Sequence, residues 1–271
     1  MARLSLCIEP ILKEYSLPDR IRIAAEAGYR TVEFWEPAGR DLAGMGAAAS
    51  SCGVGIAACL IHESNTHPLC RPGPEALDNL RRSIGMAGEI GCRTLIGLAG
   101  DAGGPLEAQR AAIVEILRSM ADTLVRADVT LVLEPLNTRI DHPGYFLDSS
   151  AAGFGIVREV GCPNIRLLFD VYHMQIMEGS LTASITDNIE NIGHFHLAGV
   201  PGRHEPTEGE VDYRYLLGRI DALGYDRYAG LEYWPSHDHR ESIARCRAYL
   251  ASAPLPPSAR TVPSGADSVR K

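Results

Sequence analysis

Short apolar runs alternate with amphipathic stretches along most of this chain. In the recurring unit, apolar residues at helical spacing lead to a glycine, a few polar residues and then a short apolar run. Glycine readily adopts the left-handed conformation that closes a helix, so each of these glycines predicts a turn from a helix into a strand. The five clearest junctions contain Gly28, Gly53, Gly91, Gly161 and Gly224.

The apolar runs predict eight strands. These strands span residues 4–8, 32–35, 54–60, 94–98, 130–133, 165–169, 194–197 and 228–232. The segments between them place apolar residues on one helical face, as Ile113, Leu117, Met120 and Leu124 illustrate. Eight strands that alternate with eight helices over about 250 residues predict a (β/α)8 TIM barrel. An open doubly wound sheet is the competing fold, but no glycine-rich phosphate-binding turn follows the first strand.

We expect one domain over residues 1–252, because no interdomain linker interrupts the repeat. The remaining stretch, 253–271, is rich in Pro, Ser and Ala and has little apolar content. Such a stretch lacks the apolar surface needed to order it, so we expect it to lie outside the barrel and to be partly disordered.

Charge and composition narrow the class of function. The formal net charge of −8 argues against sequence-independent binding to nucleic acid or to an anionic membrane. No apolar run approaches the roughly 20 residues that span a bilayer, and residues 1–9 are too short and too early charged for a signal peptide. The seven cysteines form no C-x-x-C pair and are typical of buried thiols in a reducing cytosol. We therefore expect a cytoplasmic protein with a small-molecule substrate. Barrels of this kind often pair, which is compatible with a homo-oligomer, although no stretch specifies an interface.

Four of the later predicted strands end in a side chain that can bind a metal. Glu134 follows the apolar run Leu131–Leu133, and Asp170, His196 and Glu232 end the next three strands. The carboxyl ends of barrel strands meet on one face, so these four side chains can converge. Alone, each carboxylate is commonly a helix cap or an ion-pair partner, and a lone histidine is commonly a core residue. Together they favour one shared divalent cation: Mn²⁺ or Mg²⁺ first, with Co²⁺ or Zn²⁺ as alternatives.

Several motifs resemble the hydroxypyruvate isomerase family, which lies within the larger group of xylose isomerase-like sugar isomerases and epimerases. The resemblance covers most of residues 1–250, and its most specific motifs lie at 134–139, 143–148, 169–179, 201–206, 209–213 and 230–233. It implies that Glu134, Asp170, residue 196 and Glu232 hold one metal ion, and that Glu134 and Glu232 are the catalytic acid/base pair.

The implied reaction moves a proton between adjacent carbons of a small α-hydroxycarbonyl through an enediolate, as between hydroxypyruvate and tartronate semialdehyde. One departure favours a ketose 3-epimerase as the alternative. Hydroxypyruvate isomerases commonly have glutamine where this chain has His196, whereas ketose 3-epimerases have histidine. The additional glutamate of those epimerases is absent, and Ile140 and Asp141 stand near its place. Return of the proton to the neighbouring carbon gives isomerisation, and return to the same carbon from the opposite face gives epimerisation.

The resemblance also implies substrate contacts from His173, in the loop after the sixth strand, and from Arg203, in the loop after the seventh. The guanidinium of Arg203 suits a carboxylate or paired oxygens. Trp35 and His62, at the ends of the second and third strands, are candidates for the wall of the substrate pocket.

Two residues are candidates for supporting roles. We expect Glu205 to orient Arg203, and Asn137 to order the loop that follows Glu134. His194 lies two residues from His196 on the same strand face, where we interpret it as supporting rather than ligating.

Two further classes of function remain open. A metal-dependent nuclease with this barrel would need more ligands and a basic groove, against which the net charge argues. A non-catalytic sugar-binding barrel would have no need for an opposed pair of glutamates.

Overall fold

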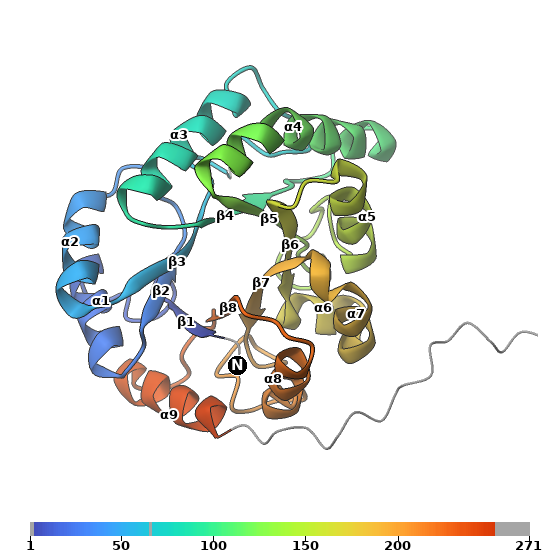
Figure 1. Ribbon diagram of the computed structural model, residues 1–271. Helices are drawn as coiled ribbons and strands as arrows, with labels where there is room; N and C mark the ends of the chain where they lie inside the picture. The colour runs from blue at the N-terminus through green and yellow to red at the C-terminus, as the bar shows by residue number, and fades with distance from the viewer. Residues whose placement is uncertain (1–2, 65–66, 253–271) are drawn as a thin grey trace, which may run out of the picture.

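The computed structural model describes residues 3–64 and 67–252, which form a closed barrel of eight parallel strands in the order β1 to β8. The strands occupy the centre of the molecule and the helices surround them (Figure 1). The strands are β1 (Arg3–Cys7), β2 (Thr31–Phe34), β3 (Gly55–Leu60), β4 (Thr94–Leu98), β5 (Thr130–Glu134), β6 (Ile165–Asp170), β7 (Ile192–Leu197) and β8 (Tyr228–Leu231). The predicted single-domain (β/α)8 barrel is confirmed.

The helices fill the connections between successive strands. They are α1 (Leu17–Glu26), α2 (Leu42–Cys52), α3 (Ala76–Glu89), α4 (Leu106–Ala127), α5 (Ser150–Val160), α6 (Val171–Met177), α7 (Leu181–Asn188), the 3-10 turn η1 (Ile189–Asn191), α8 (Tyr213–Ala222) and α9 (His239–Ala251). One connection differs from the prediction of one helix each, because β6 is followed by both α6 and α7.

The glycine junctions adopt the conformation that the sequence predicts. Gly28, Gly53, Gly91, Gly161 and Gly224 have φ angles of 88°, 62°, 70°, 69° and 79°, all in the left-handed region. Residues with a Cβ are strained there, which explains why glycine recurs at these five junctions.

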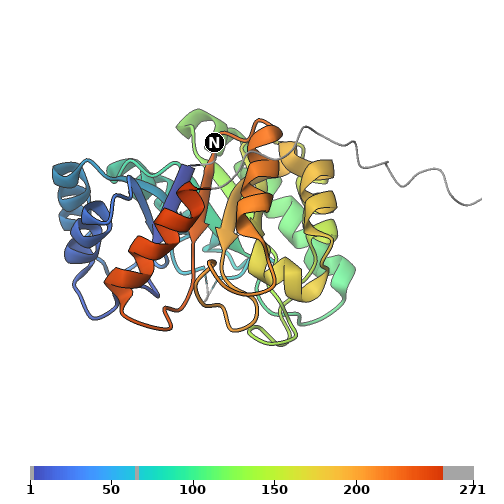
Figure 2. The same ribbon diagram turned by 90° about the horizontal axis from the view of Figure 1, so that it is seen from below.

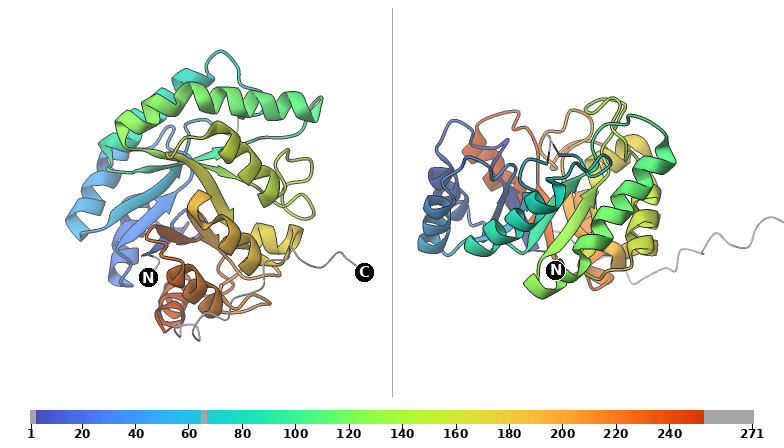
Figure 3. Two further views of the ribbon diagram at one scale, coloured as in Figure 1. Left: turned by 45° about the vertical axis from the view of Figure 1, so that its right-hand side comes forward. Right: turned by 90° about the horizontal axis from the view of Figure 1, so that it is seen from above.

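The apolar faces of the helices pack against the outside of the barrel. The four apolar residues predicted to share one face of α4 are fully buried: Ile113, Leu117, Met120 and Leu124. The helix is 22 residues long and lies along the outer side of the barrel (Figure 3). A second, separate apolar cluster is formed by side chains from β3 to β6: Ala58, Leu60, Ile96, Val132 and Leu168.

The loops that follow the strands project together from one end of the barrel (Figure 2). Two long loops border the site: 135–149 joins β5 to α5, and 198–212 joins β7 to α8. Within the described residues, no helix is long and apolar enough to cross a membrane. The stretch predicted to lie outside the barrel, 253–271, falls outside the described residues.

Candidate metal centre

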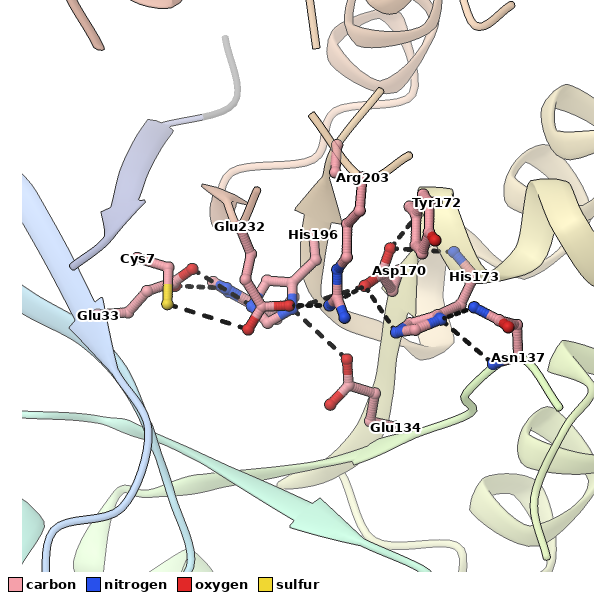
Figure 4. A network of polar contacts seen from close by, with 12 residues as sticks. Cys7, Glu33, Glu134, Asn137, Asp170, Tyr172, His173, His196, Arg203 and Glu232 are labelled. Atoms are coloured by element: carbon pink, nitrogen blue, oxygen red, sulfur yellow. Dashed lines mark hydrogen bonds and ion pairs between the residues drawn. The ribbon is translucent and has the colours of Figure 1, made fainter. Parts of the chain in front are cut away.

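The structure brings the four predicted ligands together. Glu134, Asp170, His196 and Glu232 each offer one ligand atom, and these atoms lie within 4.8 Å of one another. All four residues are at most 5% exposed. Figure 4 shows their side chains directed toward a common space from four neighbouring strands or strand ends.

Strand register explains this convergence. Asp170 and His196 are direct partners across the β6–β7 pair, and His196 pairs with Gly230 of β8, two residues before Glu232. Glu134 ends β5 opposite Leu98 of β4. Side chains alternate between the two faces of a strand, so equivalent register positions bring these groups to the same side of the barrel wall.

Asp170 has two functions at once. Its Oδ1 caps helix α6 by accepting the backbone N–H groups of Tyr172 at 2.8 Å and His173 at 3.3 Å. Its Oδ2 faces the cluster, 4.0 Å from His196 Nδ1. Asp170 can therefore cap helix α6 with one oxygen and bind a metal ion with the other. The same cap places His173 in the first turn of α6, so the prediction that His173 lies in a loop was wrong.

Arg203 supplies positive charge beside these carboxylates. Its Nη2 donates to Glu232 Oε2 and lies 3.5 Å from Asp170 Oδ2, and its side chain is 12% exposed. The guanidinium also lies over the ring of Tyr172, 5.2 Å from its centroid. Three carboxylates and one guanidinium leave an excess of negative charge that a divalent cation would neutralise.

The charges shift the titration of the cluster. Burial raises the pKa of Asp170, and the nearby Glu134 and Glu232 add to this shift despite opposing effects of Arg203 and His196. Burial opposes ionisation of Glu232, but His196 and Arg203 outweigh it and hold the pKa of that carboxyl well below its usual range. Burial also disfavours a charged His196, yet Glu232 and Glu33 raise its pKa well above the ordinary value.

Glu33 is a buried carboxylate that the sequence analysis overlooked. It lies within β2, is 1% exposed, and accepts hydrogen bonds at Oε2 from Ser5 Oγ at 3.0 Å and from His194 Nε2 at 2.8 Å. Burial raises the pKa of Glu33, but His194 and His196 outweigh it and lower the pKa to about 2. The available signal was a charged residue in the middle of an otherwise apolar strand, which requires a partner. His194 is that partner, in agreement with its supporting interpretation.

His173 is oriented by Asn137. The Nδ1 atom of His173 is 3.2 Å from the backbone N–H of Asn137 and 2.7 Å from its Nδ2, both of which are donors. The proton of the neutral ring therefore sits on Nε2, which lies 3.5 Å from Asp170 Oδ2. Burial, reinforced by Arg203, lowers the pKa of His173 well below its ordinary value.

Asn137 also orders the loop after Glu134, as predicted. Its Oδ1 accepts the backbone N–H groups of Ile140 and Asp141, each at 3.0 Å. The same residue thereby connects the loop after β5 to the ring of His173.

A pocket of about 360 Å³ opens above the cluster. Trp35 lines it and donates from Nε1 to Glu232 Oε1 at 2.6 Å. Trp234 packs edge-on against Trp35 with ring centroids 6.0 Å apart. The lining residues are Trp35, Leu60, Ile96, Leu98, Glu134, Leu136, Asp141, His142, His173, His196, Arg203, Glu232 and Trp234. Trp234 and His142 were not singled out from sequence, because both lie in loops whose path depends on the assembled barrel.

Two predicted roles do not match the geometry. His62 is not among the residues that line this pocket; its backbone N–H donates to Ser83 Oγ of α3 at 2.8 Å. Within the described residues, no hydrogen bond or ion pair joins Glu205 to Arg203. Its carboxylate instead accepts hydrogen bonds from Ser236 and from Ser242 Oγ, which follow β8. The partners of Glu205 are distant in sequence, so its position next to Arg203 in the chain was misleading.

The donor set fits a hard or borderline divalent cation. Three carboxylates and one imidazole suit Mn²⁺ or Mg²⁺ and do not specifically select zinc. Within the described residues, His196 Nδ1 has no hydrogen-bond partner although it is buried. It lies 3.4 Å from Glu232 Oε2 and 3.5 Å from Glu134 Oε1, as expected of a ligand atom that shares a cation with those oxygens.

Comparison with known proteins shows the family to which the chain belongs. Residues 21–249 match the family model described as xylose isomerase-like TIM barrel. The chain is 35% identical over 266 residues to a 2-oxo-tetronate isomerase of Cupriavidus necator, covering 92% of this chain and 99% of that protein. It is 33% identical over 252 residues to the hydroxypyruvate isomerase of Escherichia coli, covering 87% and 94%. A crystal structure titled AP endonuclease, family 2, from Brucella melitensis superposes with a TM-score of 0.87 at 31% identity, covering 92% of this chain and 99% of that one.

Proposed function

Because the chain belongs to the xylose isomerase-like TIM barrel family, among relatives that include hydroxypyruvate and 2-oxo-tetronate isomerases, we propose that it is a divalent-metal-dependent isomerase. Its proposed reaction moves a proton between adjacent carbons of a small α-hydroxycarbonyl, with hydroxypyruvate and tartronate semialdehyde as the reference pair.

One observation carries the proposal. Glu134 and Glu232 both line the pocket and both lie in the four-residue cluster, although they come from β5 and from the end of β8. A substrate held in this pocket can therefore be reached by two carboxylates from different sides. A barrel that only bound a sugar would not need this arrangement.

The two carboxylates have different surroundings. Glu232 accepts hydrogen bonds from Trp35 and Arg203, which fix its position and favour its charged form. Within the described residues, Glu134 has one ion-pair contact, from its Oε1 to His196 Nδ1 at 3.5 Å. Either can act as the general base that removes the proton next to the carbonyl, and the same or the opposite glutamate returns it. A bound Mn²⁺ or Mg²⁺ supplies Lewis-acid stabilisation of the negative charge that develops on the substrate oxygens.

His173 and Arg203 complete the proposed site. The Nε2–H of His173 has no hydrogen-bond partner among the described residues, so it is free to donate to a substrate oxygen. Arg203 is already paired with Glu232 and contributes positive charge at the same edge of the pocket. Together they favour a substrate with oxygens on neighbouring carbons.

Epimerisation of a ketose at C3 is the second candidate, favoured by the histidine at position 196. It uses the same base pair but returns the proton to the carbon that lost it. The two reactions differ in product, so a single analysis of products separates them.

Incubation of the Mn²⁺-loaded protein with hydroxypyruvate in D₂O, followed by NMR, tests the proposal. We expect tartronate semialdehyde to form, and its formation to be lost in Glu134→Gln. Parallel incubations with free ketoses test the alternative. If hydroxypyruvate is not converted but a ketose yields its C3 epimer, epimerisation replaces isomerisation as the proposed function.

A further inference from the structure

His196 has a carboxylate on each side of its ring. Its Nδ1 faces Glu134 and Glu232 in the proposed metal centre, at 3.5 and 3.4 Å. Its Nε2 faces Glu33 Oε1 at 3.3 Å on the other side. Among the described residues, neither ring nitrogen nor Glu33 Oε1 has a hydrogen-bond partner, although all three atoms are buried.

We propose that Glu33 is a positioning residue that keeps the proton of His196 on Nε2 and turns the lone pair of Nδ1 toward the metal. This inference rests on the metal centre of the proposed function. Both ring nitrogens face carboxylates, which only accept hydrogen bonds. A cation shared with Glu134 and Glu232 would take the place of a proton on Nδ1, so the proton of the neutral ring is left on Nε2, where it faces Glu33. The other nitrogen of the neutral ring is then the ligand. Carboxylates that hold a ligating histidine in this way fix both its tautomer and its ring orientation.

Glu33 is itself held rigidly. Its Oε2 accepts from Ser5 and from His194, and these two donors fix the carboxylate plane so that Oε1 faces His196. Figure 4 shows Glu33 reaching toward His196 from the side of Cys7.

Gly230 leaves the room that Glu33 needs. A Cβ at this position would lie 1.8 Å from Glu33 Oε1, closer than any real side chain allows. Gly230 pairs with His196 in the β7–β8 ladder. A side chain at position 230 would therefore occupy the space in which Glu33 approaches His196. The φ of Gly230 does not fall in the left-handed region, so backbone conformation does not account for glycine here.

The same atoms allow one competing assignment. Glu33, His194 and His196 also offer ligand atoms within 4.8 Å of one another, so they could hold a second cation. The positioning role is favoured, because His194 Nε2 and Glu33 Oε2 already form a 2.8 Å hydrogen bond. The stoichiometry of metal binding distinguishes the two assignments.

Titration of the metal-stripped protein with Mn²⁺, followed by the EPR signal of free Mn²⁺, measures affinity and stoichiometry without any assay of activity. We expect one ion per chain in the wild type and a 10- to 100-fold weaker Kd in Glu33→Gln, in line with the effects of losing such a partner. Glu33→Asp keeps the charge but shortens the reach. Positioning predicts that it also binds weakly, whereas a simple charge effect predicts nearly normal binding.

A second measurement does not depend on any variant folding. In the ¹⁵N-labelled, Mg²⁺-loaded wild type, long-range ¹H–¹⁵N correlation should show His196 protonated at Nε2 and not at Nδ1, with the signals assigned by their loss in His196→Gln. Protonation at Nδ1, normal Mn²⁺ affinity in folded Glu33→Gln or Glu33→Asp, or two ions per wild-type chain would overturn the role of Glu33. Absence of Mn²⁺ binding by the wild type would overturn the metal centre itself.

Discussion

Replacing Glu205 by glutamine should destabilise the protein and loosen the loop that carries Arg203. Glu205 is 2% exposed and accepts from the backbone N–H of Ser236 at 3.1 Å, from Ser236 Oγ at 2.9 Å and from Ser242 Oγ at 2.7 Å. It therefore ties the loop after β7 to the segment after β8 and to the first turn of α9.

The magnitude follows from these donors. Hydrogen bonds to a charged group contribute about 1.5–3 kcal/mol each, against about 0.5–1.5 kcal/mol for neutral ones. A glutamine keeps one acceptor oxygen and directs an NH₂ group at a site filled with donors. We expect Glu205→Gln to lower the free energy of unfolding at pH 7 by about 2–4 kcal/mol.

The loss should depend on pH. Burial opposes ionisation of Glu205, but the hydrogen bonds from Ser242 and Ser236 outweigh it and lower the pKa of this carboxyl below its ordinary 4.5. A carboxylate with a lowered pKa stabilises the fold above its unfolded pKa, and this contribution disappears as the pH falls through the folded value. The gap between wild type and variant should therefore be full at pH 7 and narrow in acid.

Urea unfolding at pH 7 and pH 4, followed by far-UV circular dichroism, measures both effects. Glu208→Gln is the matched control, because its side chain is 71% exposed on the same loop and its loss should change stability by no more than about 0.5 kcal/mol. A variant as stable as the wild type at pH 7, or a gap that widens on acidification, would refute the reasoning.

Three further predictions concern the pocket. Arg203→Ala should lower kcat/KM more for carboxylate-bearing substrates than for neutral ketoses. Equal losses of kcat/KM for the two classes would show that Arg203 does not bind a substrate carboxylate. Trp35→Phe removes the 2.6 Å hydrogen bond to Glu232 while keeping an aromatic wall, so kcat should fall roughly tenfold; an unchanged kcat would show that Trp35 does not position Glu232. Glu134→Gln and Glu232→Gln should each reduce turnover by at least about 10²-fold in a folded protein, and near-wild-type rates in steady-state assays would remove that residue from the base pair.

The sequence was most informative where one rule governs many positions. The glycine turns, the apolar runs and the ligands at the strand ends all follow from the repeated helix–strand unit. Glu134, Asp170, His196 and Glu232 recur at the same place in successive units, so their convergence could be predicted before any coordinates were known.

Contacts between distant segments were not predictable in this way. Ser5, Glu33 and His194 come from three different strands, and no local pattern connects them. Glu205 was assigned to Arg203 because the two are neighbours in the chain, whereas its hydrogen bonds reach residues 31 and 37 positions away.

The helix α6 shows a third kind of limit. Asp170 was predicted to be a ligand, but its additional function as a helix cap starts α6 at once and leaves no loop for His173. The position of Asp170 in the sequence fits both a helix cap and a metal ligand. Only the three-dimensional structure shows that one carboxylate oxygen caps α6 while the other faces the remaining predicted ligands.

The central claim is that Glu134, Asp170, His196 and Glu232 bind one common cation. Anomalous diffraction from crystals grown with Mn²⁺ tests it most directly. The account predicts a single strong anomalous peak within about 2.0–2.3 Å of one atom from each of these four side chains. A peak elsewhere in the barrel, or a cluster that fails to bind Mn²⁺ while the protein still turns over substrate, would contradict it.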